Sequence, residues 1–214
     1  MSFSTSPYLE QTLRWPRRGR VLLAQYDDES VIVYQAYRPS LGHWAAEHGY
    51  LGGDFSLNRM SWIKPGFMWM MYRSGWGTKP NQEVVLSIRI DRTAFDTILS
   101  SAVLSSYDPQ LYATPEEWRA DVARSDVRLQ WDPDHGPTGG KRARRVIQLG
   151  LRREMIRRYA QDWILEITDI SDFVSEQRTH VLARDLDQLH TPTESVYPVA
   201  DEAVAFRLRL DHNA

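Results

Sequence analysis

Short apolar runs recur along the chain between polar and glycine-containing segments, and they predict strands. The clearest run, residues 31–37 (VIVYQAY), is rich in β-branched and aromatic residues and follows an acidic turn. Further strands are predicted at residues 83–90, 127–131, 145–151 and 164–170, and Asp132-Pro133 is expected to end the strand at 127–131. The chain therefore contains enough strand to build a sheet.

Helical segments lie between these runs. Pro39 and Ser40 open a helix that runs through Glu47 and ends at Gly49. Residues 114–118 (TPEEW) combine a capping threonine, a first-turn proline and a glutamate three positions after the cap, which predicts a helix start. Helices are also predicted at residues 92–101 and 152–161, and the chain from Ser171 onward is expected to be mostly polar helix.

Residues 67–73 (FMWMMYR) are interpreted as another strand, broken by Gly75 and Gly77. Alternation would place Met68, Met70 and Tyr72 on one face, and the other face would carry Trp69, Met71 and Arg73. Several strands are adjacent in sequence, which favours an α+β fold with a largely antiparallel, possibly split, sheet and flanking helices. At 214 residues the chain is expected to form a single domain, with residues 171–214 as a possible helical appendage.

Composition narrows the function classes. The chain is 42% hydrophobic and 25% charged, which is ordinary for a globular protein, and it has no cysteine. Disulfides, thiolate catalysis and zinc–thiolate sites are therefore excluded. The histidines lack metal-ligand spacing, the apolar runs are too short to span a membrane, and the N-terminus lacks a secretory core. A cytoplasmic protein without membrane association is the simplest expectation.

The net charge of −2 conceals a basic region in the second half of the chain. Clustered guanidinium groups attract phosphates, so a nucleic-acid partner is one reading. A solvated helix face paired with acidic residues is the other. The residues concerned are Arg142, Arg144, Arg145, Arg152, Arg153, Arg157 and Arg158.

Residues 58–79 are the strongest candidate for a site, because they combine three tryptophans with cations. Stacking surface beside fixed positive charge suits a planar anionic ligand such as a nucleotide. Tyr72 and Trp76 are candidates for stacking, Lys64 and Arg73 for holding phosphates, and Ser74 lies where the chain enters a glycine turn. Trp69 and the methionines are expected to fill the core.

Two glutamines and a glutamate complete the candidates. Gln35, beside Tyr37 and Arg38 at a strand end, has an amide able to read a carboxamide or a base edge, or to cap a neighbouring element. Gln148 lies within an apolar strand, where its amide needs partners from a ligand or from the sheet. Glu83 is the only carboxylate between Asp54 and Asp91, and an ion pair with Lys79 or Arg89 is its alternative role.

Four segments together resemble an uncharacterised domain family, the family of unknown function indexed 4291. They are residues 33–37 (VYQAY), 59–76 (RMSWIKPGFMWMMYRSGW), 130–133 (QWDP) and 147–152 (IQLGLR). The resemblance covers nearly the whole chain, and the tryptophan-rich segment is highly specific. It implies a family without implying an activity.

A second resemblance concerns layout. The order of segments resembles the front half of ADP-ribosyltransferase-like domains, which bind NAD between two small antiparallel sheets. That order is a strand carrying Tyr34-Gln35, a helix, a glycine-rich segment at Gly52-Gly53, and an aromatic strand ending near Arg73. Gln35 replaces the usual first-motif arginine or histidine, unless Arg38 supplies it. Glu83 and Gln148 are the candidates for the closing catalytic residue.

This layout implies roles for the candidate residues. Tyr72 or Trp76 would stack the nicotinamide, Gln35 would bond its carboxamide, and Arg38 or Arg73 would neutralise the pyrophosphate. Glu83 would orient the ribose or acceptor, and a carboxylate would stabilise the oxocarbenium-like centre. The leading hypothesis is thus an NAD-dependent ADP-ribosyltransferase-like enzyme acting on a nucleotide, a nucleic acid or another phosphate-bearing acceptor.

The alternative hypothesis is a non-catalytic nucleotide- or RNA-binding domain that uses the same aromatic and arginine side chains. A nucleotide hydrolase that needs no NAD is disfavoured, because paired histidines are missing.

Overall fold

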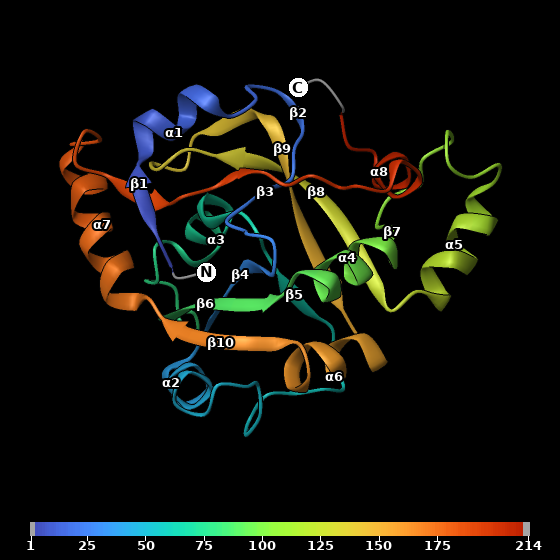
Figure 1. The fold of residues 1–214 in the computed structure, drawn as a ribbon, viewed down its shortest axis with the longest axis horizontal. Helices are drawn as coiled ribbons and strands as arrows, with labels where there is room; N and C mark the ends of the chain where they lie inside the picture. The colour runs from blue at the N-terminus through green and yellow to red at the C-terminus, as the bar shows by residue number, and fades with distance from the viewer. Residues whose placement is uncertain (1–2, 212–214) are drawn as a thin grey trace.

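The computed structural model describes residues 3–211, in which eight helices and twelve strands form an α+β fold (Figure 1). The helices are α1 (Tyr8–Arg14), α2 (Pro39–His48), α3 (Phe67–Ser74), α4 (Arg92–Ser100), α5 (Pro115–Arg124), α6 (Arg153–Gln161), α7 (Ser171–Ala183) and α8 (Glu202–Leu208). The strands are β1 (Thr5–Pro7), β2 (Gly19–Arg20), β3 (Leu23–Ala24), β4 (Ser30–Tyr37), β5 (Ser61–Ile63), β6 (Val84–Asp91), β7 (Ala102–Leu104), β8 (Val127–His135), β9 (Lys141–Leu151), β10 (Ile164–Asp169), β11 (His190–Pro192) and β12 (Ser195–Val196). The predicted fold class is confirmed.

A three-stranded antiparallel sheet contains β4, β6 and β10, with β6 in the centre. The first six side chains of β4 are all buried, which explains why its sequence is apolar throughout instead of alternating. Helix α2 packs on β6 and β10, and a Cβ at Gly42 would lie 2.5 Å from Val84, so this close approach requires glycine. The strands predicted at residues 31–37, 83–90 and 164–170 are confirmed.

The second sheet has five strands. β9 is central, antiparallel to β8 and β5 and parallel to β2, while β7 lies parallel to β8. The prediction that Asp132-Pro133 ends a strand is wrong, because β8 continues to His135 through a register shift between Pro133 and His135. A β-bulge is one of the few places where a strand accepts proline.

The strand predicted at residues 67–73 is wrong, because this segment forms helix α3. Phe67 to Met71 are all buried, and an apolar run covered on every side carries no period that separates helix from strand. Unbranched methionines favour helix. Gly75 ends α3 in the left-handed conformation, at φ 61°, with its N–H bonded to the carbonyl of Met71.

The predicted C-terminal end of α2 and the predicted start of α5 are confirmed. Gly49 caps α2 with its N–H on the carbonyl of Ala45. At α5, Thr114 Oγ1 accepts from the N–H of Glu117 at 3.2 Å, and the Glu117 carboxylate accepts from the N–H of Ala113 at 3.1 Å. The helices predicted at residues 92–101 and 152–161 correspond to α4 and α6.

The chain after Ser171 is helical only in part. It forms α7 and α8, but between them β11 pairs with β1 and β12 pairs with β3. The prediction of mostly helix is therefore wrong for residues 190–196, because the two strands within them pair with strands from the N-terminal part of the chain.

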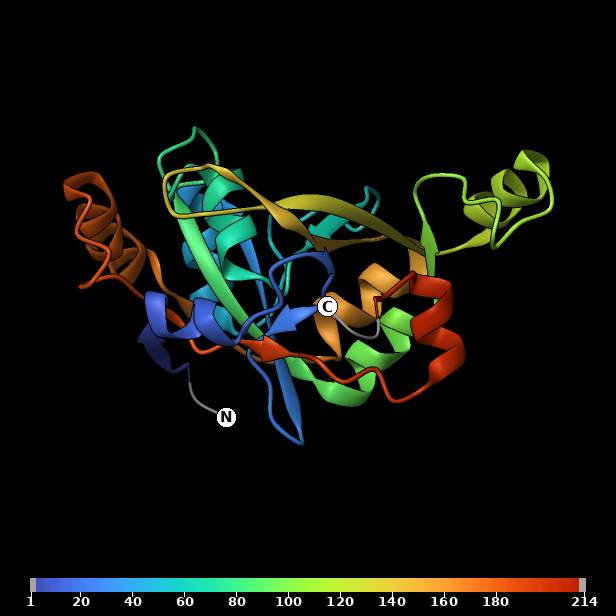
Figure 2. The ribbon, with the colours of Figure 1, turned by 90° about the horizontal axis from the view of Figure 1, so that it is seen from above.

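Helix α3 contacts β4 of the three-stranded sheet and β8 of the five-stranded sheet, and so lies between the two. Figure 1 shows α2 and α6 on the β10 side of the molecule, and Figure 2 shows α7 and α5 at opposite ends. Within residues 3–211, no helix is both long and apolar enough to cross a membrane. The ends of β4, β5 and α3 meet at one place, which holds the largest group of predicted site residues.

Candidate functional site

A cavity of about 310 Å³ opens where β4, β5 and α3 meet. It is lined by Gln35, Ala36, Tyr37, Arg59, Met60, Ser61, Trp62, Lys64, Met70, Arg73, Pro80, Asn81, Gln82 and Gln148. A second cavity of about 380 Å³ shares Tyr37, Arg59 and Asn81 with the first and extends to Arg38, Asp54 and Phe55. Together they are large enough for a nucleotide-sized ligand.

Backbone pairing fixes Lys64 at the inner edge of the first cavity. The N–H of Tyr34 donates to the carbonyl of Lys64 at 2.7 Å, and the Lys64 N–H donates back at 3.3 Å. This bridge ties the residue that follows β5 to the middle of β4. Because both segments are buried, the lysine side chain starts from a rigid position.

Lys64 is only 5% exposed, and its Nζ makes one long hydrogen bond, 3.4 Å to the carbonyl of Trp62. Within residues 3–211, no carboxylate oxygen lies within ion-pair distance of that Nζ. Burial lowers the pKa of Lys64 to about 8, with a further lowering by the charge of Arg73 and an opposing effect from Asp132. A minor neutral-amine fraction therefore exists at pH 7, and it grows as the pH rises toward 8.

Two guanidinium groups share the cavity with Lys64. Arg73, in the last turn of α3, donates from Nη1 to Gln82 Oε1 at 3.0 Å. Arg59, in the segment before β5, lines both cavities. Among the described residues that line the first cavity there is no aspartate or glutamate. The arrangement therefore favours an anionic ligand.

The side chain of Gln35 joins three elements at the cavity floor. Its Nε2 donates to Ser61 Oγ at 2.9 Å and to the Trp62 carbonyl at 3.3 Å, and its Oε1 accepts from Tyr159 of α6 at 2.8 Å. Its amide therefore positions β5 and α6, and the same hydrogen bonds limit what Gln35 offers a ligand. Tyr37 lies beside it, 3.4 Å from Ser61 Oγ, and burial raises the pKa of Tyr37.

Gln148, the other predicted glutamine, lines the cavity from β9. Its Nε2 donates to Asp132 Oδ2 at 2.7 Å, and Gln130 donates to Asp132 Oδ1 at 2.8 Å. The two amides thus hold the one carboxylate whose charge acts on Lys64.

Three predicted ligand residues lie away from both cavities. Tyr72 stacks on His135, with ring centroids 3.5 Å apart. Trp76 donates from Nε1 to the carbonyl of Pro137, and Ser74 Oγ is bonded within the helix end to Met70 and Gly77. Trp69 is 8% exposed and stacks on Tyr72, so its predicted core role is confirmed.

Arg38 lines the second cavity, whereas Glu83 lines neither cavity and contacts Asn81, which lines both. Glu83 is exposed, and its Oε1 accepts from the N–H of Asn81 at 2.9 Å, which shapes the loop lining both cavities. Arg38 makes a 2.7 Å ion pair with Asp54 beside the second cavity. The ion pair that Arg89 makes is with Glu166, across β6 and β10.

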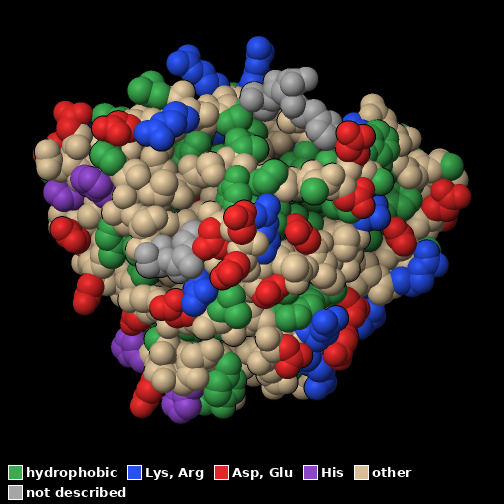
Figure 3. Space-filling model, viewed as in Figure 1, with side chains coloured by type: hydrophobic (Ala, Val, Ile, Leu, Met, Phe, Trp, Pro, Cys, Tyr) green, Lys and Arg blue, Asp and Glu red, His purple; other side chains and the backbone are tan. Residues whose placement is uncertain are grey.

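The basic region is divided among different roles. Arg144 is buried and pairs with Asp134 at 2.6 Å, and Arg152 donates to backbone carbonyls before β8. Arg142 reaches the Tyr8 hydroxyl at 3.4 Å, and Arg145 the carbonyl of Trp131. Figure 3 shows acidic and basic side chains side by side over the face it presents. The arginines therefore do not form one surface.

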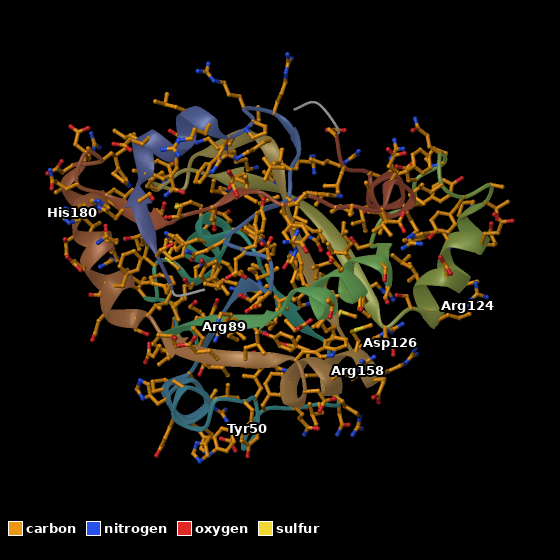
Figure 4. All side chains as sticks on the ribbon, viewed as in Figure 1. Tyr50, Arg89, Arg124, Asp126, Arg158 and His180 are labelled. Carbon is orange, nitrogen blue, oxygen red and sulfur yellow. The ribbon has the colours of Figure 1, made fainter. Side chains whose placement is uncertain are left out.

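Helix α6 carries further exposed arginines of that region. Arg153 and Arg157 are exposed on it, and Arg158 covers the ring of Trp163 at 4.4 Å. Arg153 also pairs with Asp126 at 3.3 Å. Figure 4 shows Arg158, Asp126 and Arg124 at the same end of the molecule.

Sequence reasoning missed Arg59, Ser61 and Trp62 as lining residues. Arg59 and Trp62 are a cation and an aromatic side chain within the tryptophan-rich segment, and this composition could have identified them. The prediction instead assigned the ligand contacts to residues in and after the assumed strand at 67–73. In a helix, residues three apart share a face, so Met70 and Arg73 both line the cavity while Trp69 and Tyr72 stack elsewhere. No group of three or more metal-ligating side chains occurs within residues 3–211.

Comparison with curated proteins finds no match to the chain. The sequence does match a family model over residues 21–197, a span that includes both cavities and every strand of the three-stranded and five-stranded sheets except β2. The model is described as Domain of unknown function (DUF4291), and the chain belongs to this family.

Proposed function

We propose that the protein binds a phosphate-bearing nucleotide ligand in the two adjoining cavities. The observation that carries this proposal is the convergence of Lys64, Arg59 and Arg73 on one cavity that no described carboxylate lines. Charge-assisted hydrogen bonds to phosphate are stronger than neutral ones, and guanidinium groups match phosphate geometry.

The second cavity suits the sugar and base. It shares Tyr37 and Arg59 with the first cavity and adds Phe55, while Trp62 supplies an aromatic surface in the first. Aromatic rings that line a cleft stack bases of any identity, so affinity is expected to depend more on the phosphates than on the base.

NAD cleavage with ADP-ribosyl transfer is the second candidate. Glu83 favours it, because this exposed carboxylate is bonded to Asn81, which lines both cavities. There it would orient the ribose or acceptor and stabilise the oxocarbenium-like centre, as the resemblance in layout implies. The exposed arginines of α6 would receive a nucleic-acid acceptor, and a cytoplasmic location would supply the nucleotide.

Titration calorimetry with ADP, ATP, NAD and adenosine tests the main proposal. ADP and ATP are expected to bind and adenosine to bind far more weakly, and added salt should weaken the phosphate-dependent part. Arg73→Ala should weaken ADP binding by roughly tenfold or more, the loss of one charged hydrogen bond. Arg119→Ala, which removes an exposed arginine paired with Glu116 on α5, is the control and should bind normally.

Equal affinity for adenosine and ADP, or unchanged binding in Arg73→Ala, would contradict the proposal. Nicotinamide release from NAD tests the second candidate. Turnover that is lost in Glu83→Gln while ADP binding persists would support ribosyl transfer, and absence of nicotinamide release would refute it.

A further inference from the structure

We propose that Lys64 is a nucleophile that takes a nucleotidyl group from a nucleotide pyrophosphate onto its Nζ. The inference rests on the proposed nucleotide site and deepens it by naming a reaction there. The donor class is a nucleoside triphosphate or NAD, which share a pyrophosphate bond.

The placement of Lys64 supports this role. A lysine that merely holds phosphate is usually an exposed, hydrated ammonium, whereas Lys64 is 5% exposed and has one hydrogen bond of 3.4 Å. Its backbone is fixed to Tyr34 by two hydrogen bonds, so the amine is held at the cavity wall. A buried amine without a carboxylate partner keeps a neutral fraction, and only the neutral amine is a nucleophile.

The neighbouring groups fit attack at phosphorus. Arg59 and Arg73 would neutralise the phosphate oxygens, which removes the repulsion that a dianion presents to a lone pair and stabilises the charge of the transition state. The charge of Arg73 also lowers the pKa of Lys64 and so favours loss of the ammonium proton.

The Nζ lone pair forms a bond to the α-phosphorus, and the bond from that phosphorus to the bridging oxygen breaks. The bridging oxygen leaves with the electron pair, as pyrophosphate from a triphosphate or as nicotinamide mononucleotide from NAD. The amine loses one proton to water, and the product is a phosphoramidate that an acceptor oxygen would later attack, which returns the free amine.

This chemistry differs from ribosyl transfer in the bond that breaks. Attack at phosphorus releases nicotinamide mononucleotide from NAD, whereas ribosyl transfer releases nicotinamide. The two leaving groups separate the two reactions in a single chromatogram.

The test uses the full chain with ATP or NAD and magnesium ions, quenched in alkaline denaturant because phosphoramidates are labile to acid. Intact-mass spectrometry should show one added nucleotidyl group, and peptide mapping should place it on Lys64. Lys64→Met and Lys64→Arg should lose the adduct. Lys79→Met, which removes an exposed lysine bonded to the carbonyls of Tyr72 and Arg73, should keep it.

The rate of adduct formation should rise with pH and level off above about 8, as Lys64 loses its proton. The charged groups that face Lys64 are Arg59, Arg73 of α3 and Asp132 of β8, with the Tyr37 hydroxyl of β4 beside them. Arg73→Ala should slow adduct formation of the order of a hundredfold and shift this profile to higher pH, because one cation is lost.

Each result decides the matter. Nucleotide binding by calorimetry without any adduct would overturn the nucleophile while leaving the binding site standing. Absence of both binding and adduct would overturn both. An adduct that persists in a folded Lys64→Met protein, verified by its melting curve, would assign the chemistry to another residue.

Discussion

Glu194 is a buried residue whose negative charge would destabilise the folded state. Its Oε1 accepts from the N–H of Phe67 at the start of α3, at 2.6 Å, yet burial raises the pKa of Glu194 to about 8. The carboxyl group is therefore largely protonated at neutral pH and can still accept that hydrogen bond. At the residue scale, the stability of the protein is expected to depend on this proton.

The sign follows from linkage. Glu194 holds its proton in the folded state up to about pH 8, while an unfolded glutamate loses it near its ordinary pKa of about 4.3. The contribution of Glu194 to the free energy of unfolding is complete below the pKa of the unfolded glutamate, and it is lost as the pH rises toward 8. We expect Glu194→Gln, which keeps the acceptor oxygen, to stabilise the protein at pH 8 by several kcal/mol and to have little effect near pH 4. Urea unfolding at both pH values measures this, and an equal effect at both would contradict it.

Trp69 anchors an aromatic stack at the surface of α3, with Tyr72 and His135. Trp69→Ala is expected to destabilise by about 3–5 kcal/mol, because it opens a cavity in a buried position. Tyr72→Ala is the matched control, since Tyr72 is 41% exposed and its removal should cost about 1 kcal/mol. Chemical denaturation distinguishes the two, and an unchanged midpoint in Trp69→Ala would show that the ring is not part of the core.

At the element scale, the end of α3 decides where Arg73 points. Gly75 adopts φ 61° and closes the helix on Met71, so the chain turns directly after Arg73. We expect Gly75→Ala to cost about 1–2 kcal/mol, the strain of a left-handed residue with a Cβ. Gly140→Ala is the control, because nothing lies within 4 Å of its added Cβ and its φ is not in the left-handed range.

Differential scanning calorimetry compares the two variants. A Gly75→Ala protein as stable as Gly140→Ala would mean that α3 does not need this left-handed end. If the end of α3 positions Arg73, Gly75→Ala should also weaken ADP binding more than Gly140→Ala does.

The same element shows how far the sequence could predict the structure. β4 and β6 were predictable because their apolar runs have strand length and end in turn signals. α3 was not, because its five buried residues in a row give no period, and the covering layers that decide the matter come from β4 and β8. Lys64 and Arg73, which were chosen from composition, line the first cavity. Tyr72 and Trp76 line neither cavity.

At the scale of the whole molecule, the two sheets and α3 bring together residues that are distant in sequence. Gln35, Arg73 and Gln148 come from three elements, Lys64 directly follows β5, and all four line one cavity. No local pattern predicts such convergence, since it depends on how the two sheets pack. The exposed arginines of α6 lie outside that cavity, and Tyr159 on the same helix bonds Gln35 at its floor.

The central claim is that this cavity holds the phosphates of a nucleotide. A crystal structure of the protein with bound ADP tests it most directly. We predict phosphate density within hydrogen-bond distance of Arg59, Arg73 and Lys64 Nζ, with the base toward Phe55. Density for ADP at another place, or an empty cavity in crystals grown at saturating ADP, would contradict the claim.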